Sequence, residues 1–512
     1  MTTFTIAIPM TPTRKHLLAG LIATMPALAL LFAVLLRNAG SFSYTLDDPY
    51  IHLALARNIA LGNYGINLHE LSAPSSSIVW PLILAPFSFF PGLFDKVPLI
   101  LNLLCLFLTA CLFIDATETT RWKSTLITLI VLLSLNIYGV VFTGMEHSLQ
   151  ILLVTALTCQ LLPLSRRNRR TDGVPMTAFS PRLVTVCLVL LPLVRYEGLA
   201  VTVPALLYLW LKGERRIALV AALTSFGLLA AYSLFLYSNG LGLLPSSVLA
   251  KSAHAELGTV WLNLRSNVSA YGFLLIPVLF LLAYALQRDR ALGLWVVSVT
   301  MLHFLFGRYG WYGRYELYYL TFLVLCLFEA TRALKIPGIA LAMILPLCFS
   351  SLLSPFFSTP IAASNIENQQ GRMSDIAQRL GVPVAVNDLG LVALRSNQYV
   401  LDLWGLGSKA ALDHRKRNDG PEWITDLMAA KGVSIAIVYD DWFPQKPANW
   451  HKVGEMTLLE PLVTPANATV AFYATDDGSR GLLSKTLRDY AATHPSDRYS
   501  LTLAGSEQGT AH

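Results

Sequence analysis

Residues Leu17–Leu36 read LLAGLIATMPALALLFAVLL, a run of twenty residues that contains no charge. An α-helix needs about 20 consecutive apolar residues to cross the roughly 30 Å hydrocarbon core of a bilayer. Arg14, Lys15 and His16 precede the run, as basic residues precede a signal peptide. The run is longer than the roughly 7–15 apolar residues of a signal peptide, and no small-x-small cleavage site follows it. It therefore predicts an uncleaved first transmembrane helix.

Further apolar runs follow this one to about residue 360. The chain of 512 residues is 54% hydrophobic and 13% charged, whereas soluble domains carry about 25% charged residues. Beyond Ser364 the sequence becomes mixed, with short apolar stretches at 382–386, 399–403, 434–439 and 469–473 and helical patterns at 422–431 and 481–494. Strands that alternate with helices indicate an α/β layer. We therefore predict a polytopic α-helical membrane domain at 1–360 and a small soluble α/β domain at 361–512.

The membrane domain offers twelve candidate spans, at 17–36, 79–94, 97–115, 124–142, 147–164, 183–194, 199–211, 217–237, 271–286, 291–306, 317–332 and 336–357. Basic clusters between them mark cytoplasmic loops. If every basic cluster lies in the cytoplasm, one of the apolar runs before residue 166 must not cross the membrane. The proline-rich run 79–94 is the best candidate, and 124–142 is the alternative. The short runs 183–194 and 199–211 are expected to form a broken hairpin with its tip within the membrane. About 11 transmembrane helices result.

This orientation gathers polar segments on the outer face, together with the soluble domain. They are Asp47-Asp48, Gly144–His147, Arg195–Gly198, the loop 238–270 and Gly307–Glu316. Ionisable residues at membrane depth are costly and are functional-site candidates by default. The net charge of +7 comes from the short cytoplasmic clusters, so it does not indicate a nucleic-acid partner.

The cysteines are interpreted as small buried apolar residues. All six lie in apolar runs: Cys105, Cys111, Cys159, Cys187, Cys326 and Cys348. Their spacing indicates neither a disulfide framework nor a metal site. The sequence also lacks a glycine-rich nucleotide-binding fingerprint.

Asp47 and Asp48 follow the first span and precede a short amphipathic helix. Pro49 suits the first position of that helix and Asp48 suits its cap. A capping role explains one aspartate but not two. Adjacent carboxylates can raise a pKa and supply a general base, so both residues are candidate catalytic groups.

Cations on the outer face form a second set of candidates. Arg195 lies with Glu197 inside a long apolar stretch, where it is either an ion pair that lets the chain reverse or an arginine that binds phosphate. Arg308 and Arg314 lie among aromatic residues. An interfacial belt explains tyrosine and tryptophan there, but not two arginines on the outer side. Lys251 is either a snorkelling lysine or a further cation of the site.

These segments form an ordered series of motifs. They are Asp47-Asp48-Pro49-Tyr50-Ile51, Arg57-Asn58 with Gly62 and Gly65, Ser75-Ser76-Ser77, Gly144-Met145-Glu146-His147, Arg195-Tyr196-Glu197-Gly198, Pro245 with Lys251, and Asn387-Asp388-Leu389-Gly390. In this order they resemble the GT-C superfamily of polytopic glycosyltransferases. Within it, the chain is similar to the branch that contains the mycobacterial terminal β-(1→2) arabinofuranosyltransferase of cell-wall assembly. His147 and Tyr196 depart from the residues commonest in that branch.

The resemblance implies a GT-C-like fold and an inverting transfer of a sugar, such as arabinofuranose, from a polyprenyl-phosphate donor to a cell-envelope glycan or glycolipid. It implies a bacterial inner-membrane protein whose active site and soluble domain are periplasmic. Asp47 or Asp48 would activate the acceptor hydroxyl, and Arg195, Lys251, Arg308 and Arg314 would hold the lipid phosphate. Residues expected to position the substrates are Tyr50, His52, Glu146, His147, Glu197, Trp311 and Tyr315. No cofactor is required by the ligand spacing, although Mg²⁺ or Mn²⁺ could bridge an aspartate to the phosphate.

Two other functional classes stay open. A transporter or flippase of lipid-linked glycans would show internal repeats and charges in both membrane halves, neither of which is evident. An O-antigen-ligase-like enzyme would carry a long outer loop rich in arginine and histidine within the span series. The largest outer segment here is C-terminal and lacks that clustering.

Overall fold

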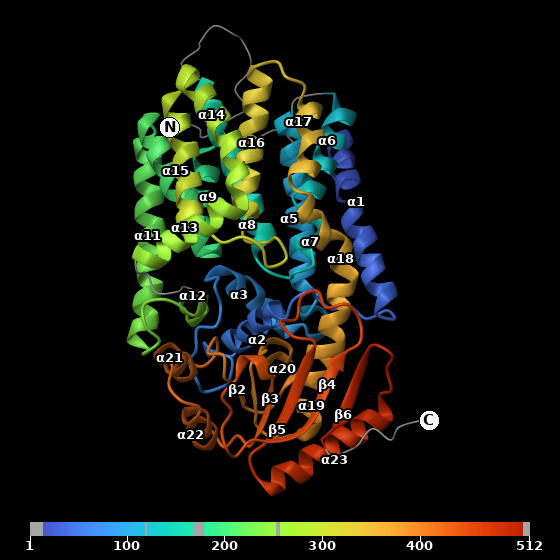
Figure 1. The fold of residues 1–512 in the computed structure, drawn as a ribbon. Helices are drawn as coiled ribbons and strands as arrows, with labels where there is room; N and C mark the ends of the chain where they lie inside the picture. Colours follow the sequence, from blue (N-terminus) through green and yellow to red (C-terminus); the bar gives the residue numbers. More distant parts are fainter. Residues whose placement is uncertain (1–13, 118–119, 167–178, 252–256, 505–512) are drawn as a thin grey trace.

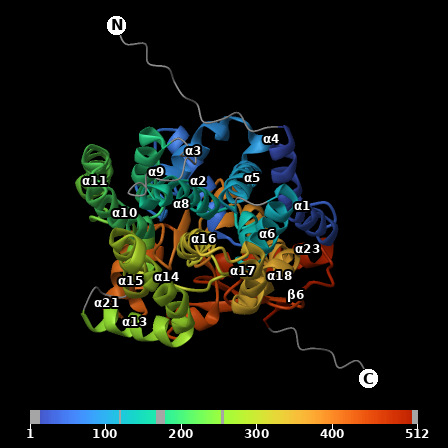
Figure 2. The ribbon, with the colours of Figure 1, turned by 90° about the horizontal axis from the view of Figure 1, so that it is seen from above.

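A bundle of long helices is joined at one end to a six-stranded sheet (Figure 1). The computed structural model describes residues 14–117, 120–166, 179–251 and 257–504. Figure 2 shows most of the bundle helices end-on. They are α1 Arg14–Arg37, α5 Val97–Thr117, α6 Arg121–Ser134, α7 Ile137–Val141, α8 His147–Leu161, α9 Pro181–Val194, α10 Leu199–Leu211, α11 Arg215–Ser238, α13 Leu257–Tyr271, α14 Leu275–Arg288, α15 Arg290–Phe306, α16 Leu317–Ala333, α17 Gly338–Cys348 and α18 Ser350–Ile366.

Several of these helices are long and apolar enough to cross a membrane. Within the described ranges there are five, at His16–Arg37, Val97–Thr117, His147–Ser165, Arg215–Ser238 and Val260–Arg288. A sixth span is possible if Gly338–Cys348 and the helix after it, bent by 71°, cross as one. Large apolar side chains face outward from the bundle, such as Phe32 at 63% and Leu223 at 74% exposure. Exposed apolar surface of this kind suits contact with lipid. The chain is a multi-pass membrane protein, and the count of about 11 spans stays a prediction.

The two ambiguous segments adopt the irregular forms that their sequences favour. Residues 79–94 divide into three short pieces, α3 Val79–Leu84, the 3₁₀ turn Ala85–Phe89 and α4 Pro91–Phe94. Proline lacks an amide hydrogen and therefore interrupts helices. Helices α9 and α10 pack against each other and are joined by the 3₁₀ turn Tyr196–Gly198. The predicted broken hairpin is thus present.

Helix α2 (Asp48–Ala60) connects the two halves of the molecule. On one side Leu53 and Ala56 belong to the core of the helix bundle, and on the other Ile51 and Leu55 belong to a core shared with the sheet. Most of the helix is buried. Asp47 and Asp48 therefore enter the structure where the bundle and the soluble domain meet.

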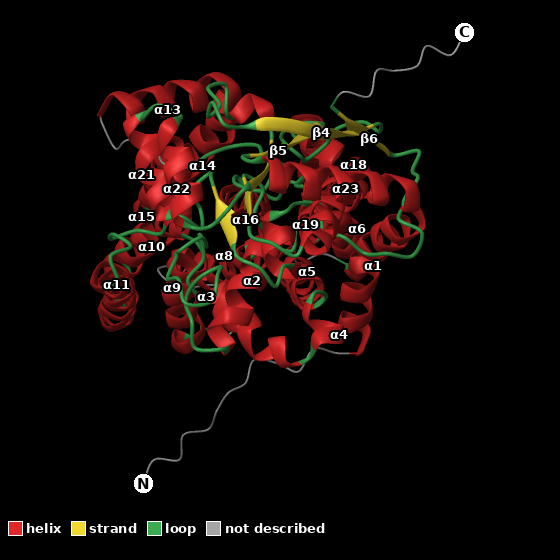
Figure 3. Ribbon diagram, turned by 90° about the horizontal axis from the view of Figure 1, so that it is seen from below, coloured by secondary structure: helices red, strands yellow, loops and turns green. Residues whose placement is uncertain are grey.

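The soluble domain is built on one mixed sheet of order β2-β1-β3-β5-β4-β6. Its strands are yellow in Figure 3. Strands β2, β1 and β3 are parallel, and Ala385 of β1 lies opposite Leu401 and Ala436. The remaining pairs are antiparallel. The strands are β1 Val384–Val386, β2 Val400–Asp402, β3 Ile435–Val438, β4 His451–Leu458, β5 Thr469–Ala474 and β6 Tyr499–Leu503. The four predicted strands are confirmed, and β4 and β6 were not predicted.

Helices pack against both faces of this sheet. One face buries residues of α19 and α23, and the opposite face buries residues of α21 and α22. Both predicted helices, α22 and α23, are present. The helices of the domain are α19 Arg372–Leu380, α20 Gly390–Arg395, α21 Lys409–Arg417, α22 Glu422–Ala430 and α23 Asp477–Thr493.

The bundle and the soluble domain are joined by one helix and by several polar contacts. Helix α18 continues through a π-helical turn, Glu367–Gly371, into α19. The Arg37 guanidinium at the end of α1 donates to Glu460 over 2.6 Å. Asn67 exchanges two hydrogen bonds with the backbone of Val400, both of 2.9 Å. These contacts fix the soluble domain against the loops at that end of the bundle.

Candidate functional site

Asp48 is paired with an arginine from a distant loop. Arg314 Nη2 donates to Asp48 Oδ2 over 2.7 Å. The helix begins one residue earlier than predicted: Asp48 is its first residue, and the cap position falls on Asp47, which makes no capping bond. The side chain of Asp48 is 29% exposed. It therefore combines a charged partner with access from solvent.

Asp47 has a different partner, although it is the next residue. Its carboxylate accepts hydrogen bonds from the backbone N–H groups of Gly390 (2.5 Å) and Leu391 (2.9 Å), at the start of α20 in the soluble domain. Burial and the nearby charge of Asp388 raise the pKa of Asp47 to about 8. The geometry thus commits Asp47 to joining the two domains, whereas Asp48 is bonded to the bundle.

Arg314 is buried but only partly bonded. Its side chain is 1% exposed, and its guanidinium lies 5.1 Å from the centre of the Tyr315 ring. Nη2 carries the bond to Asp48, whereas Nε and Nη1 have no hydrogen-bond partner among the described residues. Buried donors without partners are costly. Two N–H donors beside a carboxylate are therefore available to an anion such as phosphate.

The loop that presents Arg314 has an uncommon backbone. Trp311 (φ 49°) and Tyr312 (φ 68°) adopt left-handed conformations, as do Gly310 and Gly313 on either side. Such conformations are strained for residues that carry a Cβ. The loop is held by the Tyr312 hydroxyl, which lies 2.8 Å from the Pro355 carbonyl of α18. Strain maintained by tertiary contacts is typical of functional loops.

A second buried arginine, Arg195, is fully engaged with carboxylates. Nη1 lies 2.6 Å from Glu146 and Nη2 lies 2.8 Å from Glu197. His52 approaches Glu146 at 3.6 Å. Arg195 also lies 5.7 Å from the centre of the Tyr315 ring, so this ring stands close to both arginines. The ion pair expected of Arg195 and Glu197 is present, and Glu146 joins it.

These contacts bring together four of the five segments predicted to converge, all except the loop 238–270. His147 is buried, and its ring centre lies 6.3 Å from that of Tyr315. Tyr50 is also buried, and its hydroxyl accepts from the Tyr44 N–H at 3.0 Å, which is a structural role. In Figure 1 the turn between α14 and α15 lies at the end of the bundle opposite the sheet, as the basic residues there led us to expect. The side of the membrane itself stays a prediction.

Three predicted residues are not placed in this group. Arg308 is exposed and makes no hydrogen bond or ion pair within the described parts of the chain. Trp311 is 56% exposed. Lys251 ends α12 (Ser246–Lys251), and its side chain lies outside what the structure describes.

Asp388 is a neighbouring residue that was quoted as part of a motif but not predicted as a site residue. It follows β1. Its charge interacts with the carboxyl group of Asp47, and the charge of Asp48 interacts with its own carboxyl group. Its position just beyond a buried parallel strand was a usable signal, because ligands of such sheets bind at the carboxyl ends of the strands.

Comparisons with known proteins were made for the whole chain. Residues 364–473 match a family described as "Domain of unknown function (DUF8728)". No match was found among curated proteins. The structure is similar to the apo oligosaccharyltransferase of Archaeoglobus fulgidus, with 9% identity, a TM-score of 0.46, and coverage of 91% of this chain and 75% of the other. It is also similar to ArnT from Cupriavidus metallidurans bound to undecaprenyl phosphate, with 12% identity, a TM-score of 0.47, and coverage of 88% and 98%.

A metal ion does not suit the aspartate pair. Both carboxylate oxygens of Asp47 accept backbone N–H groups, and Asp48 Oδ2 is bonded to Arg314. Within the described residues, no group of three or more His, Cys, Asp or Glu side chains could hold a metal.

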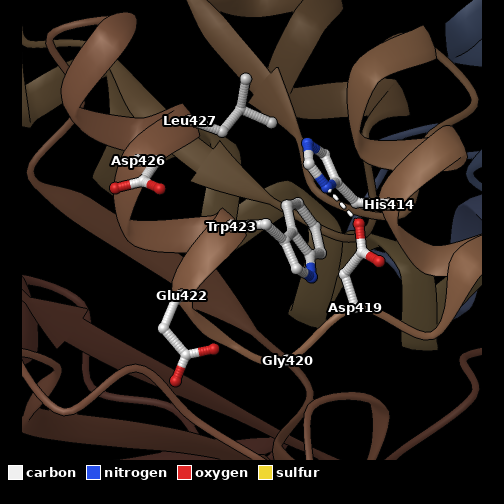
Figure 4. Close-up of a pocket in the computed structure, with 7 residues that line it drawn as sticks. All are labelled: His414, Asp419, Gly420, Glu422, Trp423, Asp426 and Leu427. Atoms are coloured by element: carbon white, nitrogen blue, oxygen red, sulfur yellow. Dashed lines mark hydrogen bonds and ion pairs between the residues drawn. The ribbon is translucent and has the colours of Figure 1, made fainter.

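A separate pocket of about 430 Å³ lies between α21 and α22 in the soluble domain (Figure 4). Trp423 stacks against His414 there, and His414 lies 2.7 Å from Asp419. The other lining residues are Gly420, Glu422, Asp426 and Leu427. None of the predicted site residues contributes to it.

Proposed function

We propose that the protein is a membrane glycosyltransferase that uses a polyprenyl-phosphate sugar as donor. The observation that carries the proposal is the pair Asp48–Arg314. It places a partly exposed carboxylate beside a buried guanidinium with two unpartnered N–H donors. Transfer from a phosphate-linked sugar needs both a base for the incoming hydroxyl and a cation for the departing phosphate.

In the proposed reaction Asp48 accepts the proton of the acceptor hydroxyl. As that O–H bond breaks, the acceptor oxygen bonds to the anomeric carbon from the face opposite the phosphate. The bond from that carbon to the phosphate oxygen breaks, and its electron pair leaves with the lipid phosphate. Arg314 Nε and Nη1 donate to this phosphate as its charge increases. The product has inverted configuration.

Arg195 contributes fixed positive charge next to this centre. Glu146 and Glu197 neutralise it, so Arg314 rather than Arg195 is the principal phosphate ligand. The Tyr315 ring lies near both guanidinium groups, 5.1 Å from Arg314 and 5.7 Å from Arg195.

The finer features of the proposal come from the resemblance of the motifs. They are a pentofuranose donor such as an arabinofuranosyl lipid, a cell-envelope glycan or glycolipid acceptor, and an active site on the periplasmic side of a bacterial inner membrane. The loop that ends in Lys251 is included as a donor-binding element on the same basis.

The test is release of polyprenyl phosphate from a panel of polyprenyl-phosphate sugars by the purified full-length protein, with membrane glycans as acceptors. Asp48→Asn should lower the rate by at least about 10²-fold, since general-base catalysis typically contributes 10²–10⁴-fold. Donor binding should persist. The matched control is Asp489→Asn, an exposed aspartate on α23, which should be unaffected.

Two outcomes would contradict the proposal. If Asp48→Asn retained the wild-type rate, the carboxylate would not be the base. If the wild-type protein released no polyprenyl phosphate from any donor, the glycosyltransferase assignment would fail, and a flipping assay in vesicles would test the transporter alternative.

A further inference from the structure

The soluble domain reaches the candidate catalytic centre through Asp388. This residue follows β1, between the parallel strands β2 and β3. Two residues later, the N–H groups of Gly390 and Leu391 bind Asp47. The carboxyl ends of parallel strands are where α/β sheets bind ligands, and here that edge is turned toward the aspartate pair.

The Asp388 carboxyl is held on one oxygen only. Oδ2 accepts from the Tyr439 hydroxyl at 2.6 Å and from Gln370 Nε2 at 2.7 Å. Oδ1 receives no hydrogen bond from any described residue, and the side chain is only half-buried. One oxygen is therefore fixed by the protein while the other is available to a ligand.

The groups that hold Asp388 are themselves fixed. Gln369 Nε2 donates to the carbonyls of Asn467 (2.8 Å) and Ala468 (3.0 Å), which sets the orientation of its amide. Its Oε1 accepts a hydrogen bond from Gln370 Nε2 at 3.0 Å, so the amide that donates to Asp388 is itself positioned. A carboxyl group oriented through two layers of hydrogen bonds is preorganised for binding.

The charged surroundings of Asp388 favour a hydrogen-bond donor over an anion. The Asp47 and Asp48 carboxylates interact with it electrostatically, and burial raises its pKa. Arg314 is bonded to Asp48 rather than to Asp388. A saccharide supplies neutral hydroxyl donors, which suit carboxylate oxygens at this position.

We propose that Asp388 binds the acceptor saccharide, with Oδ1 accepting a hydrogen bond from a hydroxyl adjacent to the one that Asp48 deprotonates. This inference rests on the proposed function and assigns the acceptor side of that site to the interface between the two domains. Tyr439 is a positioning residue, because it acts by orienting Asp388.

The experiment measures two quantities on the full-length protein and its variants. The first is equilibrium binding of fluorescently labelled pentose and hexose disaccharides. The second is slow hydrolysis of the polyprenyl-phosphate sugar in the absence of acceptor, in which water replaces the acceptor hydroxyl. Asp388→Asn should weaken disaccharide binding about 10-fold or more, the loss expected for a hydrogen bond to a charged group. Hydrolysis, which depends on Asp48 and Arg314, should change by a smaller factor than disaccharide binding.

Two further variants separate binding from folding. Tyr439→Phe should weaken disaccharide binding by a smaller factor, because Asp388 remains but loses one of its two donors. Asp489→Asn is the control, since Asp489 is exposed on α23; its binding should equal that of wild type. Thermal unfolding of all variants should coincide to within a few degrees.

The inference is overturned if Asp388→Asn binds disaccharides as the wild type does, if no disaccharide binds the wild type, or if hydrolysis falls in parallel with binding. Failure of the proposed function has a different signature. It would be an absence of donor cleavage in the wild type, which the binding measurement does not depend on.

Discussion

Adjacent aspartates with different partners are the central feature at the scale of residues. Asp47 accepts two backbone hydrogen bonds from the soluble domain, and Asp48 pairs with Arg314 from the bundle. The sequence predicts that the pair matters, because one capping residue would not require two carboxylates. It cannot assign their roles, since the partners lie more than 260 positions away along the chain.

Replacing Arg314 by lysine tests the guanidinium itself. Arg314→Lys keeps a positive charge near Asp48 but removes the fork that contains Nε and Nη1. We expect the KM for the donor to rise about 10- to 100-fold, since a hydrogen bond to a charged group contributes roughly 1.5–3 kcal/mol. The exposed Arg480 provides the control Arg480→Lys, which should leave the donor KM unchanged. An unchanged donor KM in Arg314→Lys would remove this residue from phosphate binding.

The raised pKa of Asp47 predicts a pH dependence of stability. The pKa rises from about 3.9 in the unfolded chain to about 8 in the folded protein. The folded state therefore binds more protons in this window, and this group's contribution to stability falls as pH rises from about 4 to 8. Asp47→Asn should reduce the dependence of Tm on pH between pH 5 and pH 8, measured by thermal unfolding in detergent. The slope should persist in Asp489→Asn, and equal slopes in wild type and Asp47→Asn would contradict the assignment.

At the scale of elements, α20 and α2 form the principal joint between the domains. The start of α20 is close to Asp47: a Cβ added at Gly390 would lie 2.7 Å from Asp47 Oδ2 and would also meet the Asp47 carbonyl oxygen. A residue with a Cβ at position 390 can be accommodated only if α20 or the start of α2 moves. The absence of a side chain at Gly390 is therefore a condition of this contact.

Gly390→Ala should lower the free energy of unfolding by about 1–3 kcal/mol, as overpacking usually does. It should also expose the 366–372 region to limited proteolysis. Gly481→Ala in α23 is the matched control, because a Cβ there meets nothing within 4 Å. Alanine is the better helix former by roughly 0.5–1 kcal/mol, so this control should be neutral or stabilising. Equal Tm values for the two variants would contradict a tight joint at α20.

The sequence predicted elements where a strong local pattern existed. The strands β1 and β3 are continuous apolar runs, as expected for strands buried on both faces. In contrast β4, His451–Leu458, includes His451, Lys452, Gly454 and Glu455, and its pairing with β5 contains an irregularity between Lys452 and Gly454. Its strand character comes from its two neighbours in the sheet rather than from its own residues, so local propensity could not reveal it.

At the scale of the whole molecule, the positive-inside pattern gives an orientation that can be measured. Helix α2 and the soluble domain lie at one end of the bundle, and the turn between α14 and α15 lies at the other (Figure 1). The convergence was predictable because basic loops fix which segments share a side. The number of complete membrane crossings was not predictable, since bent helices and short helices are compatible with the same pattern of basic loops.

Cysteine labelling in intact cells checks the orientation. In a background without the native cysteines, Ser484→Cys on α23 should react with a membrane-impermeant maleimide from outside. Ala291→Cys, at the start of α15, should react only after the cells are opened. The reverse pattern would place the soluble domain in the cytoplasm and would exclude a periplasmic acceptor.

The π-helical turn Glu367–Gly371 determines how the chain can change length over evolution. A π-helical turn contains one residue more than the corresponding α-helical turn. Deleting one residue there would restore a regular α-helix and remove the widened turn that brings Gln370 to Asp388. Insertions and deletions should therefore accumulate in the peripheral loops of related chains while this five-residue turn keeps a constant length.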